Sequence, residues 1–144
     1  MDQALVRAEA AMREAFSAVI GRDGDAMVSV ISKLGDREAN AALNLARLVS
    51  REVVVDVSDG QPTDDQFRTV AGQIADSESW ADLDADGVET YLKELYRGQQ
   101  PTTGTAELVG MAYVVGGFLL AAYAGSDREW WAYLDEILDR IVPA

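Results

Sequence analysis

The chain contains one long apolar stretch, from Ala106 to Gly125, in which no charged residue follows Glu107. Its Ala, Leu and Met residues favour an α-helix, and the stretch is too long for an ordinary strand. A helix that is apolar on all sides is buried either inside a protein or inside a membrane. We therefore expect a central helix over residues 106–124 against which the other helices pack.

A buried core helix explains this stretch better than a membrane span does. A span needs about 20 apolar residues and usually has Lys or Arg on one flank. Here three glycines interrupt the stretch, and the flanks carry Glu107 and Asp127. One face of the expected helix consists of small residues that let a neighbouring backbone approach closely: Ala106, Gly110, Gly117 and Ala121. A minor alternative places a second copy of the chain on this face, as a homodimer.

Apolar residues recur at helical spacing through the rest of the chain, and capping residues and glycines divide it into further helices. We expect a first helix over residues 2–20, a short second helix that stops at Gly35, a third from Asp36 to Arg51 or beyond, a fourth that opens at Thr63, a fifth from Asp86 to Gly98, and a last from Ser126 to Pro143. The predicted fold is all-α, with a single helical domain over residues 1–144. It is a compact bundle of about seven helices around the central one.

Several helix ends are predicted from local patterns. Capping boxes are expected at Thr63–Gln66, Asp86–Glu89 and Ser126–Glu129, and either Thr103 or Thr105 is expected to cap the central helix. The segment 53–57 is rich in Val and is therefore ambiguous. Because no second strand candidate can pair with it, we interpret it as the fraying end of the third helix or as an extended connection.

The composition excludes several classes of chemistry. The sequence has no Cys and no His. It therefore cannot form disulfides, an ordinary zinc site, or a Ser-His-Asp or Cys-His catalytic group. No other feature calls for a cofactor, and we expect none.

The formal net charge of −13 is the strongest clue to a partner. Such a chain repels nucleic acid and anionic membranes at long range and attracts basic proteins. Solubility alone is the alternative explanation. The N-terminal segment lacks the apolar core of a signal peptide, so the expected location is cytoplasmic.

Acidic residues are concentrated in the middle of the chain, where a predicted acidic face comprises Asp76, Glu78, Asp82, Asp84, Asp86 and Glu89. Part of this segment resembles the opening of an EF-hand calcium loop in its spacing of oxygen ligands. The position of the bidentate Glu, however, is Lys93. We therefore expect a helix-capping loop rather than a calcium site. The functional interpretation is a surface for a basic protein partner.

Two further groups are candidates for binding. A polar stripe on the third helix consists of Arg37, Asn40, Asn44, Arg47 and Arg51. Amides and guanidinium groups together can hold a carboxylate or a phosphate, but in so acidic a chain intramolecular ion pairs are the simpler explanation. The candidate aromatic anchors are Trp80, Trp131 and Tyr133. Trp130 fits the core face of the last helix. Trp131 and Tyr133 do not lie on the same line along this helix, so we expect one of them to be exposed.

The remaining enzyme hypothesis is a Mg²⁺-dependent helical hydrolase acting on nucleotides. Acid pairs three residues apart, as in Asp86/Glu89 and Glu136/Asp139, can supply oxygen ligands to Mg²⁺ from facing helices. No glycine-rich phosphate loop accompanies them. The leading prediction is a small, acidic, non-catalytic protein-binding module, such as an inhibitor, an immunity-type protein or a phage-encoded antagonist. The alternative is a self-associating assembly protein, and the hydrolase comes third.

Overall fold

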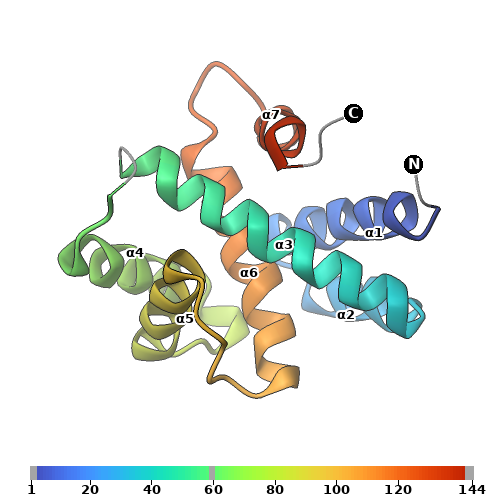
Figure 1. Ribbon diagram of the computed structural model, residues 1–144, viewed down its shortest axis with the longest axis horizontal. Coiled ribbons are helices and arrows are strands. Elements are labelled where there is room, and N and C mark those ends of the chain that lie inside the picture. Colours follow the sequence, from blue (N-terminus) through green and yellow to red (C-terminus); the bar gives the residue numbers. More distant parts are fainter. Residues whose placement is uncertain (1–2, 59–60, 142–144) are drawn as a thin grey trace.

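The structure, a computed structural model, describes residues 3–58 and 61–141. The described residues form α-helices and one short 3₁₀ helix, with no strand among them, so the all-α prediction is confirmed (Figure 1). The elements are α1 (Gln3–Ile20), α2 (Gly24–Ser32), α3 (Asp36–Val57), α4 (Asp64–Ser77), η1 (Ser79–Ala81), α5 (Ala85–Arg97), α6 (Thr105–Tyr123) and α7 (Trp130–Ile141).

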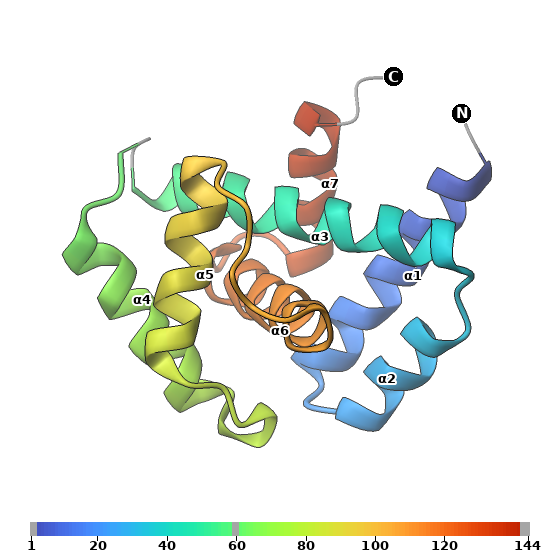
Figure 2. The same ribbon diagram turned by 60° about the horizontal axis from the view of Figure 1, so that its bottom comes forward.

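Helix α6 lies at the centre of the bundle, as the apolar stretch predicts. It packs against α1, α3 and α7. Figure 2 shows α6 nearly end-on, between a hairpin of α1 and α2 on one side and a hairpin of α4 and α5 on the other. Helix α3 runs across the bundle and contacts α1, α5, α6 and α7. The buried side chains form one continuous core.

The middle of α6 is buried on every side, because every residue from Met111 to Gly117 is buried. Of the helices in the described ranges, only α6 is long and apolar enough to cross a membrane. Its segment Ala106–Tyr123 has a mean hydropathy of 1.6 and is 56% buried in the structure. The core helix of a bundle satisfies the same criteria of length and composition.

Two glycines let α6 approach α1 closely. A Cβ atom built on Gly116 would lie 2.6 Å from Cε1 of Phe16, and one on Gly117 would lie 2.7 Å from Cγ1 of Val19. A neighbouring helix of the same chain therefore covers Gly117, whereas Ala121 of the same small-residue face is exposed.

The segment 53–57 is neither frayed nor extended, because α3 continues to Val57. Its inner side chains, Val53 and Val54, are buried in the core, and this packing outweighs the weak preference of Val for strands. On the outer side, the Asp56 carboxylate accepts hydrogen bonds from the Tyr133 hydroxyl at 2.9 Å and from Arg140 Nη1 at 2.9 and 3.0 Å. The last turn of α3 thus holds α7.

The capping predictions have mixed outcomes. The capping box of Thr63 and Gln66 is confirmed, with both reciprocal hydrogen bonds present. The predicted box at Asp86 is wrong, because α5 begins earlier, after Asp84, whose side chain makes no capping bond. Helix α6 follows Gly104, so neither predicted threonine caps it.

The last helix begins at Trp130 rather than at Ser126. Arg128 explains the delay, since its Nε donates to the carbonyl of Ala124 and its Nη1 donates to Glu136 at 2.7 Å. Its guanidinium also lies 3.9 Å from the centroid of the Tyr133 ring. These contacts keep residues 124–129 in a non-helical connection. The predicted stop at Pro143 lies outside the described residues.

Candidate functional site

The predicted acidic face is located in the turn between α4 and α5, around η1. Asp76, Asp82, Asp84 and Asp86 are exposed there, whereas Glu78 is buried and Glu89 is half-buried. In Figure 2 this turn approaches the α1–α2 turn at the lower edge of the bundle. Four of the six carboxylates are therefore exposed, whereas Glu78 and Glu89 are at least partly buried.

Glu78 is a structural residue. It is only 6% exposed, and its carboxylate accepts a hydrogen bond from the indole N–H of Trp80. The Trp80 ring packs against the start of α2, since a Cβ atom built on Gly24 would lie 3.1 Å from Cζ3 of the indole. Trp80 is thus an internal anchor between the two hairpins rather than an exposed one.

Glu89 is neutralised within the molecule. Lys93 donates a hydrogen bond to it at 2.7 Å, and Nε of Arg68 lies 3.7 Å from its carboxylate. The hydrogen bond from Lys93 is the main reason why the pKa of Glu89 lies below its ordinary value. Glu89 therefore offers little charge to a partner.

The four exposed residues Asp76, Asp82, Asp84 and Asp86, named here the acidic surface, have no ion-pair partner in the described part of the chain. The local backbone accounts for the presence of Asp at two of these four positions. Asp86 lies in the first turn of α5, where a negative charge is favourable, and Asp82 has a left-handed backbone (φ 55°) that Asp tolerates. Asp76 is different, because a negative charge in the last turn of α4 opposes the helix dipole.

The carboxylates were also compared with the arrangement that a metal ion requires. Within the described ranges, no group of three or more Asp or Glu side chains is arranged to hold a metal ion. The acid pairs expected to face one another lie on α5 and α7, which Figure 1 shows on different sides of α3. One member of each pair is also bound to a cation, Glu89 to Lys93 and Glu136 to Arg128.

The polar stripe on α3 separates into two parts. Arg37, Asn40 and Asn44 are exposed, whereas Arg47 and Arg51 are half-buried. The guanidinium of Arg51 lies 5.9 Å from the ring centroid of Tyr96. Nε of Arg47 is buried with no hydrogen-bond partner in the described part of the chain. Arg47 and Arg51 are therefore less accessible to a partner than the first three residues of the stripe.

Of the two aromatic residues predicted to diverge on α7, Trp131 is the exposed one. Its exposed fraction is 51%, whereas Tyr133 is buried and bonded to Asp56. Burial is the main cause of the raised pKa of Tyr133, and the Asp56 carboxylate raises it further. Trp131 alone remains a candidate anchor for a partner.

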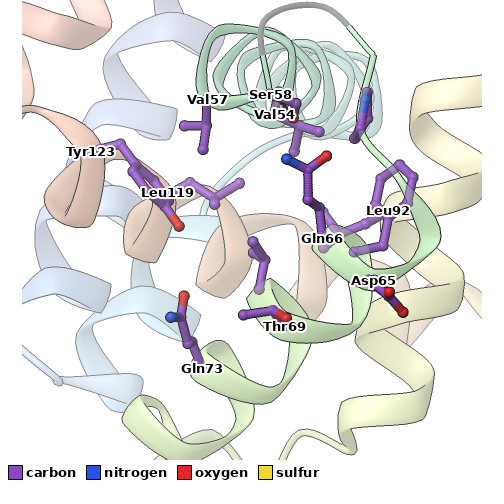
Figure 3. Close-up of a pocket in the computed structure, with 13 residues that line it drawn as sticks. Val54, Val57, Ser58, Asp65, Gln66, Thr69, Gln73, Leu92, Leu119 and Tyr123 are labelled. Carbon is purple, nitrogen blue, oxygen red and sulfur yellow. Dashed lines mark hydrogen bonds between the residues drawn. The ribbon is translucent and has the colours of Figure 1, made fainter.

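The structure also contains an apolar groove that sequence reasoning did not identify. It has a volume of about 250 Å³ and lies between the end of α3, the outer side of α4 and the end of α6 (Figure 3). Its lining includes Val54, Phe67, Val70, Leu92, Leu119 and Tyr123. These residues come from four helices, so no local pattern could have grouped them.

A second, more polar cleft of about 320 Å³ lies between the α1–α2 turn and the end of α4. Its lining includes Arg22, Glu78, Gly117 and Ala121. Arg22 has a left-handed backbone, with φ 57°. The small-residue face of α6 thus serves two purposes, since it admits α1 at one point and leaves this cleft open at another.

The comparisons with known proteins identify no relative. No family model matches this chain, and no match was found among curated proteins or among solved structures.

Proposed function

We propose that this protein is a non-catalytic binding module that engages a basic protein through the acidic surface. The observation that carries the proposal is the set of exposed carboxylates at Asp76, Asp82, Asp84 and Asp86, which have no compensating cation in the described part of the chain.

The physical role of such a surface is to steer and orient a partner. Single exposed ion pairs contribute little, typically about 0–1 kcal/mol each. A cluster of like charges nevertheless raises the association rate and rejects acidic competitors. An inhibitor or immunity-type protein uses this principle when its carboxylates occupy a basic site that otherwise binds phosphate groups.

Two double variants with equal changes in charge test the proposal. Asp76→Lys with Asp84→Lys alters the acidic surface. The control, Glu14→Lys with Asp139→Lys, changes two exposed acids that also have no ion-pair partner among the described residues. Asp139 matches Asp76, since both lie in the last turn of a helix.

Tagged proteins are used to capture partners from a nuclease-treated lysate of the native host at low and high salt. We expect the wild type and the control variant to retain one basic protein at low salt, and the acidic-surface variant to lose it. High salt should release this basic protein from the wild type and from the control variant, because salt screens exposed charges. Equal recovery with both variants, or capture that salt does not weaken, would contradict the proposal.

Self-association is the second candidate function, and the exposed indole of Trp131 favours it. It requires an oligomer at micromolar concentration that Trp131→Ser reduces. Sedimentation velocity of the two proteins tests this candidate, because a protein that stays monomeric at micromolar concentration does not self-associate.

A further inference from the structure

We propose that the apolar groove binds an uncharged, mainly apolar small molecule about the size of one substituted aromatic ring. The groove is separate from the acidic surface, because it is lined by the end of α3, the outer side of α4 and the end of α6. The inference therefore stands or fails independently of the proposed function.

The lining of the groove reaches the hydrophobic core. Its floor includes Phe67, Leu92 and Leu119, which are core side chains that are only 1–2% exposed. Most grooves that hold small molecules are lined mainly by apolar side chains with a few polar groups. A ligand placed here would rest directly on the hydrophobic core.

The volume sets the size of the occupant. The groove measures about 250 Å³. A cavity of about 150 Å³ accommodates one benzene molecule, and pockets for drug-sized ligands begin at about 300 Å³. A single ring with a short substituent fits between these limits.

Polar groups line both ends of the groove. At one end they are engaged within the protein, since Ser58 donates to the carbonyl of Val54 and Gln66 accepts from the backbone N–H of Thr63. The end formed by Tyr123 and Gln73 is named here the polar end. Figure 3 shows the Tyr123 hydroxyl of α6 pointing toward the Gln73 amide of α4, with the Thr69 hydroxyl on the same helix as Gln73. None of these side chains has a hydrogen-bond partner among the described residues. They can therefore donate to, and accept from, one hydroxyl, carbonyl or amide on a ligand.

The charges around the groove exclude an anionic ligand. Asp65 is the only charged side chain that the described lining contains, and its carboxylate lies 3.8 Å from Nη1 of Arg68 outside the groove. No Lys or Arg lines the groove to compensate a buried carboxylate or phosphate, whose desolvation is costly. The net charge of −13 opposes anions further.

Three related compounds test the chemical class: benzyl alcohol, benzoate and toluene. Binding is followed by amide chemical shifts in ¹⁵N-labelled protein at millimolar compound. We expect benzyl alcohol to cause saturable shifts at Thr69, Gln73 and Leu119, and benzoate to cause none there. Absence of saturable shifts with benzyl alcohol, or equal binding of benzoate, would overturn the proposal.

A blocking variant and a matched control locate the binding. Val57→Trp places a large side chain at the groove, and Val28→Trp makes the same change on α2, away from the groove; both valines are exposed. Benzyl alcohol should bind to the Val28→Trp protein and not to the Val57→Trp protein. If Val57→Trp does not fold, Thr69→Phe at the exposed lip of α4 serves as the block. Unchanged shifts in a folded blocking variant would refute the site.

The polar end is tested by removing its hydrogen-bonding groups. Tyr123→Phe together with Gln73→Leu should weaken the binding of benzyl alcohol by about three- to tenfold, the usual value of a hydrogen bond. Binding of toluene should not weaken, because it makes no such bond. Equal weakening of both compounds would show that the two residues only shape the groove, and would contradict their assigned role.

Discussion

Trp80 donates a hydrogen bond from its indole N–H to the carboxylate of Glu78, two residues earlier in the chain. The Trp80 ring also packs against Gly24, so that the turn carrying the acidic surface is joined to the α1–α2 hairpin. The main helix contacts do not include a pairing of α2 with α4 or α5. The Trp80 contact is therefore important for the position of the exposed carboxylates.

Trp80→Phe should lower the free energy of unfolding by about 1–3 kcal/mol, because it leaves the buried Glu78 carboxylate without its donor. Trp131→Phe is the matched control and should change stability by no more than about 0.5 kcal/mol, since Trp131 is exposed. Urea unfolding measures both values. Equal losses from the two substitutions would show that the hydrogen bond to Glu78 contributes nothing specific.

The same substitution at two glycines of α6 should have opposite effects. Gly116→Ala places a Cβ atom 2.6 Å from Phe16, and the overpacking should cost about 1–3 kcal/mol. Gly110→Ala meets nothing within 4 Å and should stabilise the helix by about 0.5–1 kcal/mol. Thermal unfolding of the two variants gives the comparison. A loss of stability in Gly110→Ala would contradict the arrangement of α6.

The contact between α3 and α7 depends on Asp56. Tyr133→Phe removes the hydroxyl that donates to this carboxylate and should destabilise the protein by about 0.5–1.5 kcal/mol. Arg140→Gln removes the charged donor to the same carboxylate. Because the two side chains share one acceptor, their contributions should not be additive. The loss in free energy of unfolding of the double variant should differ from the sum of the two single losses. Strict additivity in urea unfolding would show that Asp56 does not couple them.

Alkaline pH should unfold the protein through its buried tyrosines. Burial raises the pKa of Tyr113 to about 12 from an ordinary value of 10.0, and it also raises the pKa values of Tyr91 and Tyr133. The folded state therefore favours the neutral phenols. The stability that they contribute is complete below pH 10 and is lost as the pH rises through the folded-state pKa values.

This loss can be measured by urea unfolding at a series of alkaline pH values, with phenolate absorbance recorded in parallel. We expect the buried tyrosines to ionise together with unfolding, and Tyr113→Phe to shift the loss of stability to higher pH. Normal ionisation of all the tyrosines in the folded protein would contradict the burial of their hydroxyl groups.

The sequence predicted the fold because helix formation here follows from patterns that are local. The uncharged stretch placed α6 at the centre, and the apolar periodicity placed the surrounding helices. Two of the errors lie at helix ends where side chains make contacts that the apolar pattern does not show. Arg128 delays the start of α7 through its bonds to Ala124 and Glu136, and the Asp56 contacts accompany the unbroken end of α3.

The candidate site was predictable only in outline. Counting acidic residues located the turn between α4 and α5, but it could not distinguish the exposed Asp76 from the buried Glu78 two residues later. That distinction depends on the position of Trp80, which is set by α2. The apolar groove could not be predicted at all, because its walls meet only after several helices have packed.

The most direct test of the acidic surface is to identify what contacts it. A photo-cross-linking amino acid is introduced at Asp84, or at Asp139 as the control on α7, and each protein is irradiated in host lysate at low and high salt. The acidic-surface account predicts that position 84 cross-links one basic protein at low salt, that high salt abolishes the product, and that position 139 gives none. Equal products from both positions, or a product at position 84 that salt does not affect, would contradict it.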